Sequence, residues 1–374
     1  MSIARGPEGT TPARCRRLQT CGSEQAMGME KNMNEADFDW ANLDFGYHKA
    51  DSNIRYTWKD GSWGEGVLTP DEVLPLHMAA TCLHYGQQCF EGLKAFRTKN
   101  GDVVVFRIEE NAKRMMHSCR KILMEPVPEE MFIDAVFRTI NANRRFVPPY
   151  GTGASLYIRP LVIGSGPQVG VKPAGEYIFV VLVTPVGPYF KTGFKPVDLV
   201  VEEEVDRAAP LGVGDVKVGG NYAAGMRASM GAKQKGFTEV LYLDAKEKRY
   251  LDESGPANFF AITKKGTYVT PESESILPSI TNKSLISLAE EMGLSPERRP
   301  VDVEEIFDFQ EAGCCGTAAV ITPVASITYR DRKAVYTKDG QPGRYCTELY
   351  NKLTAIQVGD EPDPYGWVRR VPEK

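Results

Sequence analysis

A lone lysine, Lys217, stands between two glycine clusters in the segment GVGDVKVGGNY, residues 212–222. Flanking glycines let the backbone turn tightly and let a bulky group approach closely, and a lysine amine can form a Schiff base with an aldehyde. The pattern indicates a site where a cofactor ring could lie against the lysine. A turn whose lysine points into water is the alternative that these residues leave open. The glycine spacing fits neither the dinucleotide fingerprint nor the P-loop.

An acidic candidate follows Lys217 along the chain. The cofactor that needs a Schiff-base lysine is pyridoxal 5'-phosphate, whose site also requires an acid on the ring nitrogen and a phosphate cradle. Asp252 and Glu253 precede a glycine turn and a predicted strand, in LDESGPANFF, residues 251–260. Either carboxylate could serve the ring, although paired acids before a turn are also typical of solvated surface.

Composition restricts the class of protein. The chain has 374 residues, of which 42% are hydrophobic and 25% charged, with a formal net charge of -4. Without a basic excess, nucleic acid is not an expected partner. The longest apolar run, residues 177–183, has the length of a strand, so we expect no membrane span. A chain of this length predicts two domains and a cleft between them.

Cysteine and histidine usage argues against a metal centre and a disulfide scaffold. The eight cysteines include no CxxC pair, which favours a reducing, cytoplasmic environment. The four histidines lack metal-ligand spacing, so no metal is expected.

The chain divides by its local pattern into four segments. Residues 1–33 are rich in Gly, Pro, Arg, Ser and Thr, and we expect them to be disordered. Residues 34–187 predict a small mixed α/β domain, residues 188–194 a linker with Pro and Gly, and residues 195–374 a larger α/β domain.

Periodicity and turn signals predict the main elements. Residues 92–98 and 103–106, joined by a Lys-Asn-Gly-Asp turn, predict a hairpin. Apolar spacing predicts helices at 109–123, 128–145, 223–235, 280–292 and 344–356. Strands are expected at 155–158, 177–184, 197–201, 240–243, 259–262 and 318–321.

Five motifs in a fixed order identify a resemblance. Lys217 in GVGDVKVGGNY and Glu253 in E-x-G-x-x-N-F-F occur with three further segments. These are FEGLKAF at 90–96, YIRP at 157–160 and GTAA at 316–319. The set resembles the class IV pyridoxal phosphate enzymes, specifically the branched-chain amino acid aminotransferases, over about residues 40–360. The resemblance implies the two-domain α/β (α+β) architecture of fold type IV, like that of D-amino acid aminotransferase.

The resemblance assigns roles around the cofactor, pyridoxal 5'-phosphate. It makes Lys217 the Schiff-base lysine and proton carrier, and Glu253 the partner of the ring nitrogen. It gives Tyr222 a hydrogen bond to the ring's phenolic oxygen and Arg114 the pairing with the phosphate. It also implies phosphate contacts from the loop at Ser275 and Ile276, ahead of the helix after Pro278, and from the hydroxyl of Thr317. A helix-surface ion pair is the alternative for Arg114.

The resemblance also implies the substrate pocket and its assembly. Residues around the substrate would be Tyr85, Phe90, Tyr157, Arg159, Tyr189, Tyr222, Thr317 and Ala318. A homodimer is implied, in which residues 169–171 of one subunit reach the other's site. Two departures from the family pattern are Asn282, where Arg or Lys is usual, and Pro256, which donates no N–H.

The implied activity is transfer of the amino group of L-leucine, L-isoleucine and L-valine to 2-oxoglutarate. A D-amino acid aminotransferase or an aminodeoxychorismate lyase is the rival enzyme, since both share the lysine and the acid. A catalytically inactive binding protein on the same fold is a third possibility, which the intact lysine, acid and arginine argue against.

Overall fold

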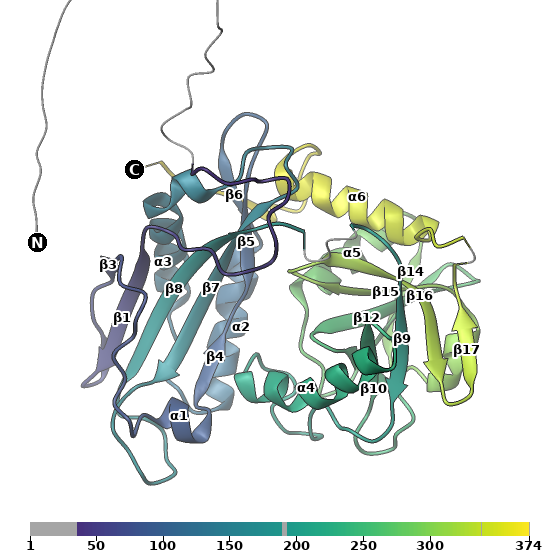
Figure 1. The fold of residues 1–374 in the computed structure, drawn as a ribbon, viewed down its shortest axis with the longest axis horizontal. Helices are drawn as coiled ribbons and strands as arrows, with labels where there is room; N and C mark the ends of the chain where they lie inside the picture. Colours follow the sequence, from purple (N-terminus) through teal and green to yellow (C-terminus); the bar gives the residue numbers. More distant parts are fainter. Residues whose placement is uncertain (1–35, 189–192, 338, 374) are drawn as a thin grey trace, which may run out of the picture. The chain divides into compact units, whose positions relative to one another are not determined.

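The computed structural model describes residues 36–188, 193–337 and 339–373, and residues from 36 onward belong to one unit. Their helices and strands are arranged around two sheets (Figure 1), of which the first is antiparallel throughout and the second is mixed. The predicted hairpin is confirmed as β5 (Leu93–Arg97) and β6 (Val103–Phe106), which pair antiparallel. The turn between them has Gly101 at φ 87°, a conformation that glycine adopts without strain.

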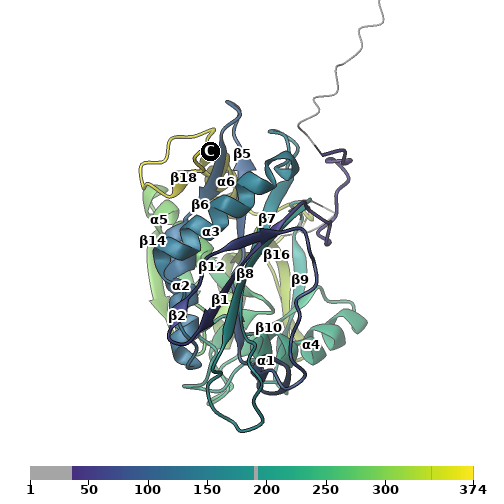
Figure 2. The same cartoon turned by 90° about the vertical axis from the view of Figure 1, so that its left-hand side faces the viewer.

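The first sheet has the order β18-β6-β5-β7-β8-β1-β2, with β3 on β1 and β4 on β7. The strands are β1 (Asn53–Lys59), β2 (Ser62–Trp63), β3 (Val67–Thr69), β4 (Gln88–Phe90), β7 (Ser155–Gly164), β8 (Tyr177–Val186) and β18 (Val368–Arg370), besides β5 and β6. The helices of this part are α1 (Thr81–Tyr85), α2 (Ile108–Lys121), α3 (Glu129–Ala142) and the 3-10 turn η1 (Arg144–Phe146). Figure 2 shows α2 and α3 together on one face of this sheet.

The core of the first part lies between that face and the two helices. Phe179 of β8 is fully buried, and its ring lies 6.2 Å from that of Phe132 on α3 and 5.7 Å from that of Tyr56 on β1. Alternate residues of β8 point to opposite faces, which puts Phe179 and Val181 into this core.

The second sheet has the order β11-β10-β9-β16-β15-β12-β13-β14, with β17 on β16. Its strands are β9 (Val197–Glu202), β10 (Glu239–Leu243), β11 (Leu251–Ser254), β12 (Ala257–Thr263), β13 (Thr267–Pro271), β14 (Ser295–Arg299), β15 (Phe309–Gly316), β16 (Val320–Tyr329) and β17 (Arg332–Val335). The helices are α4 (Gly219–Gln234), α5 (Ile280–Glu291), α6 (Arg344–Val358) and the 3-10 turn η2 (Val303–Phe307).

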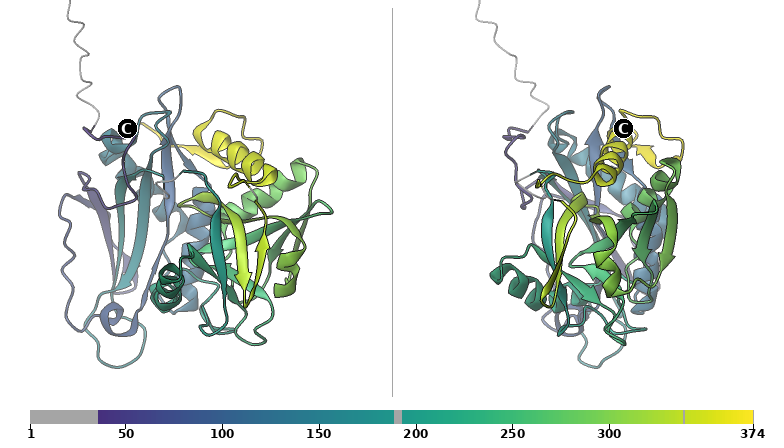
Figure 3. Two further views of the ribbon diagram at one scale, coloured as in Figure 1. Left: turned by 45° about the vertical axis from the view of Figure 1, so that its right-hand side comes forward. Right: turned by 90° about the vertical axis from the view of Figure 1, so that its right-hand side faces the viewer.

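Both faces of the second sheet are covered. Phe260 and Ile262 of β12 pack with residues of α5 and α6, whereas Phe259 and Ala261 belong to a core that includes η2. Helix α4 packs separately against β10 through Ala228 and Ala232. Figure 3 shows α4 apart from α5 and α6.

The predicted domain boundary falls between the two sheets, and the division into two domains stays a prediction. One segment departs from the predicted limits: residues 368–370 form β18, which pairs with β6 of the first sheet. Residues 1–33 and Tyr189 lie outside the described residues.

The strand expected at 318–321 is wrong at its start. Residues 317–319 form a turn, and β16 begins at Val320, whose φ of 63° lies in the left-handed region. Such a backbone is unusual for a β-branched residue and is held by the surrounding structure. The pairing of Gly316 with Val320 closes this turn.

We predict that Phe179→Ala lowers the free energy of unfolding by about 3 to 5 kcal/mol, because it leaves a cavity among stacked rings. Urea unfolding followed by circular dichroism measures it, and an unchanged midpoint would contradict the packing described. Met78→Ala is the control, since Met78 is 81% exposed and is expected to change the unfolding free energy by less than about 0.5 kcal/mol.

Candidate active site

A cavity of about 310 Å³ is lined by residues of both sheets. It brings together eight of the residues predicted from the sequence, namely Phe90, Arg114, Tyr157, Arg159, Lys217, Tyr222, Thr317 and Ala318. A second cavity of about 390 Å³ shares Tyr222, Pro256 and Leu277 with it and is lined by Glu253. The predicted lysine and acid therefore face adjoining spaces.

Backbone contacts fix the position of Lys217. Its carbonyl oxygen accepts a hydrogen bond from the N–H of Phe90 at 3.0 Å, and its own N–H donates to the Ser118 hydroxyl at 3.1 Å. Val218 forms a bridge with Cys89 of β4. The Lys217 segment thus lies along the edge of β4, which directs the side chain into the cavity.

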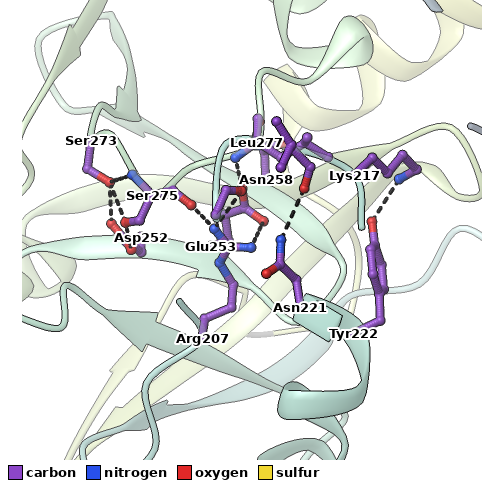
Figure 4. Close-up of polar contacts among 12 residues, drawn as sticks. Arg207, Lys217, Asn221, Tyr222, Asp252, Glu253, Asn258, Ser273, Ser275 and Leu277 are labelled. Carbon is purple, nitrogen blue, oxygen red and sulfur yellow. Dashed lines mark hydrogen bonds and ion pairs between the residues drawn. The ribbon is translucent and has the colours of Figure 1, made fainter. Parts of the chain in front are cut away.

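The amine of Lys217 has a hydroxyl partner. Its Nζ donates to the hydroxyl oxygen of Tyr222, 2.7 Å away, on the first turn of α4 (Figure 4). The same nitrogen lies 5.1 Å from the ring centroid of Phe90. The amine of Lys217 therefore contacts a hydroxyl and an aromatic ring of the protein. The alternative, a lysine that points into water, is wrong.

The glycines around Lys217 allow close approach of the protein's own segments. A Cβ at Gly214 would lie 2.2 Å from the carbonyl oxygen of Ser275, and one at Gly219 would lie 1.8 Å from the amide nitrogen of Gln88. No side chain fits at either position. These two glycines are thus explained by packing, where the sequence suggested a cofactor ring.

Arg114 forms a buried ion pair. Its Nε and Nη2 donate to the two carboxylate oxygens of Glu91 at 2.7 and 2.8 Å, and Asn111 donates to the same carboxylate. Burial opposes ionisation of Glu91, but the attraction and hydrogen bonds of Arg114 outweigh it and hold the pKa of Glu91 below its ordinary value. The surface ion pair considered from the sequence is therefore wrong, because Glu91 is fully buried.

The remaining donors of Arg114 suit an anion. A guanidinium has five N–H groups, of which two serve Glu91 and one, on Nη1, serves the carbonyl oxygen of Pro278. One N–H on each terminal nitrogen is left for a ligand in the cavity. Paired N–H groups of this kind match phosphate oxygens.

Helix α5 points its first turn to the same cavity. Ser279 caps the helix by accepting from the N–H of Asn282, and Ser279 and Ile280 line the cavity. The amides of Ile280 and Thr281 come before the first intrahelical hydrogen bond, so they can donate to an anion.

Ser275 and Ile276, which the resemblance places at the phosphate, are not among the residues that line either cavity. The hydroxyl of Ser275 donates to Asp252 at 2.7 Å, and the cavity lining begins two residues further on, at Leu277. Asn282 turns toward β13, where it accepts from Tyr268 and donates to Thr270. Asn282 therefore fastens the start of α5 to the sheet.

The two acidic candidates separate clearly. Asp252 accepts hydrogen bonds from the hydroxyls of Ser273 and Ser275, whereas Glu253 accepts from the N–H of Leu277 and pairs with Arg207 (Figure 4). Neighbouring strand residues point to opposite faces, and Glu253 is the one that lines a cavity. Burial raises the pKa of Glu253 to about 7, although Arg207 acts in the opposite direction.

The turn that carries Thr317 and Ala318 is held by a buried lysine. Lys94 of β5 donates from Nζ to the carbonyl oxygen of Ala318 at 2.7 Å. Burial lowers the pKa of Lys94 to about 8. A positive charge behind the turn favours a carboxylate in front of it.

Aromatic rings form one wall of the cavity. The ring of Phe45 lies 5.3 Å from that of Tyr157, and the guanidinium of Arg159 lies 4.7 Å over the ring of Phe90. Arg159 also donates to the Tyr157 hydroxyl at 3.0 Å. The wall is apolar and ends in a cation.

Tyr85 lies away from the cavity lining. Its side chain is 43% exposed, and its hydroxyl donates to the carbonyl oxygen of Val169. Tyr85 is not among the residues that line either cavity, and its predicted substrate contact stays a prediction.

Four residues of the site were missed from the sequence: Phe45, Glu91, Lys94 and Arg207. Glu91 and Lys94 stand in the FEGLKAF motif, where a charge inside an apolar strand could have indicated them. Arg207 and Phe45 carry no local signal, since the acid that pairs with Arg207 is Glu253 and the ring that packs on Phe45 is Tyr157, both far along the chain.

Metal-binding clusters and membrane-spanning helices are both absent from the described part of the chain. Its residues contain no group of three or more His, Cys, Asp or Glu side chains that could hold a metal ion. None of its helices is both long and apolar enough to cross a membrane.

Comparisons with known proteins agree on one family. The family model described as amino-transferase class IV matches residues 88–327. The branched-chain-amino-acid aminotransferase of Haemophilus influenzae is 47% identical, over 90% of this chain and 99% of that protein.

Solved structures are similar as well. The branched-chain amino acid aminotransferase of Escherichia coli matches with a TM-score of 0.72 and 28% identity, over 87% of this chain and 100% of that one. The branched-chain amino acid aminotransferase of Thermobaculum terrenum, in its PLP-bound holo form, shares the fold with a TM-score of 0.70 and 24% identity, over 87% of this chain and 99% of that one.

The Arg114 pair predicts a test of cofactor binding. Arg114→Ala alone would leave the buried Glu91 uncompensated, at a cost of about 3 to 5 kcal/mol in stability. The double variant Arg114→Met with Glu91→Gln removes both charges and separates folding from binding. We expect it to fold and to bind pyridoxal 5'-phosphate about tenfold to a hundredfold more weakly, because charge-assisted hydrogen bonds contribute about 1.5 to 3 kcal/mol.

Equilibrium titration of the apoprotein with the cofactor measures the dissociation constant. The matched control is the double variant Arg145→Met with Asp51→Asn, which removes an ion pair on the surface. An unchanged dissociation constant in the Arg114 double variant would remove Arg114 from the phosphate site.

Proposed function

The chain belongs to the class IV aminotransferases, within their branched-chain-amino-acid group, and from this premise we propose that it transfers the amino group of L-leucine, L-isoleucine and L-valine to 2-oxoglutarate. One observation carries the proposal. The amine of Lys217, bonded to the Tyr222 hydroxyl, faces a cavity that also contains Arg114 and adjoins Glu253. These are the functional groups that pyridoxal 5'-phosphate requires.

The residues present fit this cofactor. The two free N–H groups of Arg114 and the first-turn amides of α5 suit its phosphate, together with the Thr317 hydroxyl. Glu253 is the carboxylate for the ring nitrogen, and Tyr222 is the hydroxyl for the phenolic oxygen. Ser275 and Ile276 are not part of this set.

When bound, pyridoxal 5'-phosphate supplies an aldehyde for the lysine amine and an electron-withdrawing ring that stabilises negative charge at the substrate Cα. The protein supplies the proton transfers. The neutral amine of Lys217 accepts the proton from the substrate Cα and delivers it to the cofactor carbon. Both transfers need one amine within reach of the two carbon atoms. The hydrogen bond to Tyr222 holds Nζ in place within the cavity.

The wall of Phe45, Phe90 and Tyr157 supports an apolar substrate side chain. The turn at Thr317 and Ala318, with the Lys94 ammonium behind it, supports a site for the substrate's α-carboxylate. The guanidinium of Arg159, on the same wall, is the cation we assign to the second carboxylate of 2-oxoglutarate.

The proposed assembly is a homodimer in the cytoplasm. The Tyr85 hydroxyl donates to the carbonyl oxygen of Val169, and Val169 and Val171 in the same segment are both exposed. An exposed apolar group of this kind supports contact with a second copy, whose cavity Tyr85 would complete. The described cysteines are free thiols, which suits a reducing compartment.

We predict that Lys217→Ala abolishes the yellow absorbance of the bound cofactor and lowers turnover by several orders of magnitude, since the reacting amine is lost. Absorbance spectra and steady-state assays with L-leucine and 2-oxoglutarate measure both. Lys233→Ala is the matched control, because Lys233 is a second lysine on the same cavity. Activity of Lys217→Ala within tenfold of the wild type would rule out the assignment.

The apolar wall predicts substrate preference. Leucine exceeds alanine by three carbons, and at about 0.8 kcal/mol per buried methylene its kcat/KM should be somewhat under a hundredfold higher. Leucine, isoleucine and valine should differ little among themselves. A panel of L-leucine, L-alanine and D-alanine with 2-oxoglutarate tests this. Equal rates for leucine and alanine, or a preference for D-alanine, would favour the rival D-amino acid aminotransferase.

A further inference from the structure

Arg207 is a buried arginine whose guanidinium joins three segments of the site. Its Nη1 lies 3.5 Å from Oε2 of Glu253, in an ion pair whose two side chains are 7% and 5% exposed. Its Nη2 donates to the carbonyl oxygen of Gly214 at 3.2 Å and also to that of Ser275. Figure 4 shows this guanidinium directed at Glu253.

Each of the three segments carries a functional group. Gly214 precedes Lys217 by three residues, and Ser275 precedes Leu277, whose N–H donates to Oε1 of Glu253. The Gly214 and Ser275 segments touch so closely that a Cβ at Gly214 would lie 2.2 Å from the Ser275 oxygen. Arg207 donates to both carbonyl oxygens at this contact. The side chain of Arg207 thus contacts the Glu253 carboxylate, the segment that leads to Lys217 and the segment that leads to Leu277, which lines both cavities.

The charges around Glu253 come from several elements. Arg207, Lys217 and Arg114 favour its ionised form, while Asp252 disfavours it. Glu239 lines the same cavity, and the Cys315 thiol is also near. Among these groups Arg207 makes the ion pair with the carboxylate, and burial strengthens that attraction.

We propose that Arg207 is a positioning residue that keeps the Glu253 carboxylate ionised and aimed at the cofactor's ring nitrogen, so that the shared proton resides on the ring. This inference rests on the proposed function, in which Glu253 is the partner of that nitrogen. A neutral Glu253 would leave the ring less electron-withdrawing, and transamination would slow.

The direction of the pH dependence follows from charge. Glu253 is ionised only above its pKa, which burial raises to about 7 and which Arg207 lowers from a still higher value. Without the guanidinium this pKa moves up, and less of the carboxylate is ionised at neutral pH. The acid limb of kcat/KM, where activity is lost as pH falls, therefore moves to higher pH.

The test compares Arg207→Gln and Arg207→Lys with the wild-type holoenzyme. For Arg207→Gln we expect the acid limb of kcat/KM for L-leucine to rise by about one pH unit or more, since a neighbouring arginine lowers a carboxyl pKa by about 1 to 3 units. Arg207→Lys keeps the charge, so its acid limb should lie close to that of the wild type, with most of the shift seen in Arg207→Gln absent. Titration of each apoprotein with pyridoxal 5'-phosphate across pH is the second readout, and weaker binding should be confined to the acid side.

Two further variants separate the possible failures. Arg97→Gln is the control for structural loss, because Nη2 of Arg97 also donates to two backbone carbonyl oxygens, those of Arg144 and Val147. It should lower the melting temperature and leave the acid limb in place. Glu253→Gln tests the premise. Wild-type activity in that variant would overturn the assignment of Glu253 to the ring nitrogen, and the role of Arg207 would fall with it.

The inference is overturned if Arg207→Gln lowers kcat/KM equally at every pH, or if Arg207→Lys gives no recovery. Both results would reduce Arg207 to a structural link. Should Arg207→Gln not fold, Arg207→Lys alone decides, because its ammonium cannot reproduce all the guanidinium's bonds and should move the acid limb in the same direction by a smaller amount.

Discussion

The hydrogen bond from the Phe90 N–H to the Lys217 carbonyl oxygen joins the site's two halves. It lies next to the bridge between Cys89 and Val218, so that the Lys217 segment continues the edge of β4. Because β4 belongs to the first sheet and α4 starts directly after Val218, this short contact sets where the lysine, Tyr222 and the aromatic wall stand relative to one another. Glycine at position 219 makes the contact possible, since Gln88 occupies the space of a side chain.

The charged groups of the site are paired before any ligand enters. Arg114 is held by Glu91, Glu253 by Arg207, and Lys94 by the carbonyl oxygen of Ala318. Burying these charges costs free energy, and their partners recover part of it. In return the donors and acceptors are already oriented, so little reorganisation is needed when a charged ligand binds.

Local pattern predicted much of the fold. The hairpin at 92–106 and the helix at 128–145 follow from turn residues and apolar spacing, and both were found. The strand expected at 318–321 failed because an Ala-Ala-Val-Ile run contains no turn signal, and the left-handed backbone of Val320 is imposed by its neighbours. The linker expected at 188–194 stays a prediction, since residues 189–192 lie outside the described part of the chain, and β8 before it continues through Pro185 to Val186.

The site could be predicted only where a motif carried it. Lys217, Tyr222 and Arg114 were found from their sequence context, and they line one cavity. The E-x-G-x-x-N-F-F motif assigned the acid to Glu253 and not to Asp252, whereas the turn after them does not by itself reveal which face of β11 meets the cavity. Arg207 could not be predicted, because its role depends on its combined contacts with Gly214, Ser275 and Glu253 in the folded protein. The roles of these residues toward cofactor and substrate stay predictions.

The pairing of β18 with β6 has a consequence for synthesis on the ribosome. Residues 103–106 leave the exit tunnel long before residues 368–370, so the edge of β6 that β18 covers stays unpaired while the second sheet is made. An unpaired edge can join other chains, and here it consists of the apolar strand Val103–Phe106. Vectorial folding of this protein therefore keeps one aggregation-prone edge open until the last strand has emerged.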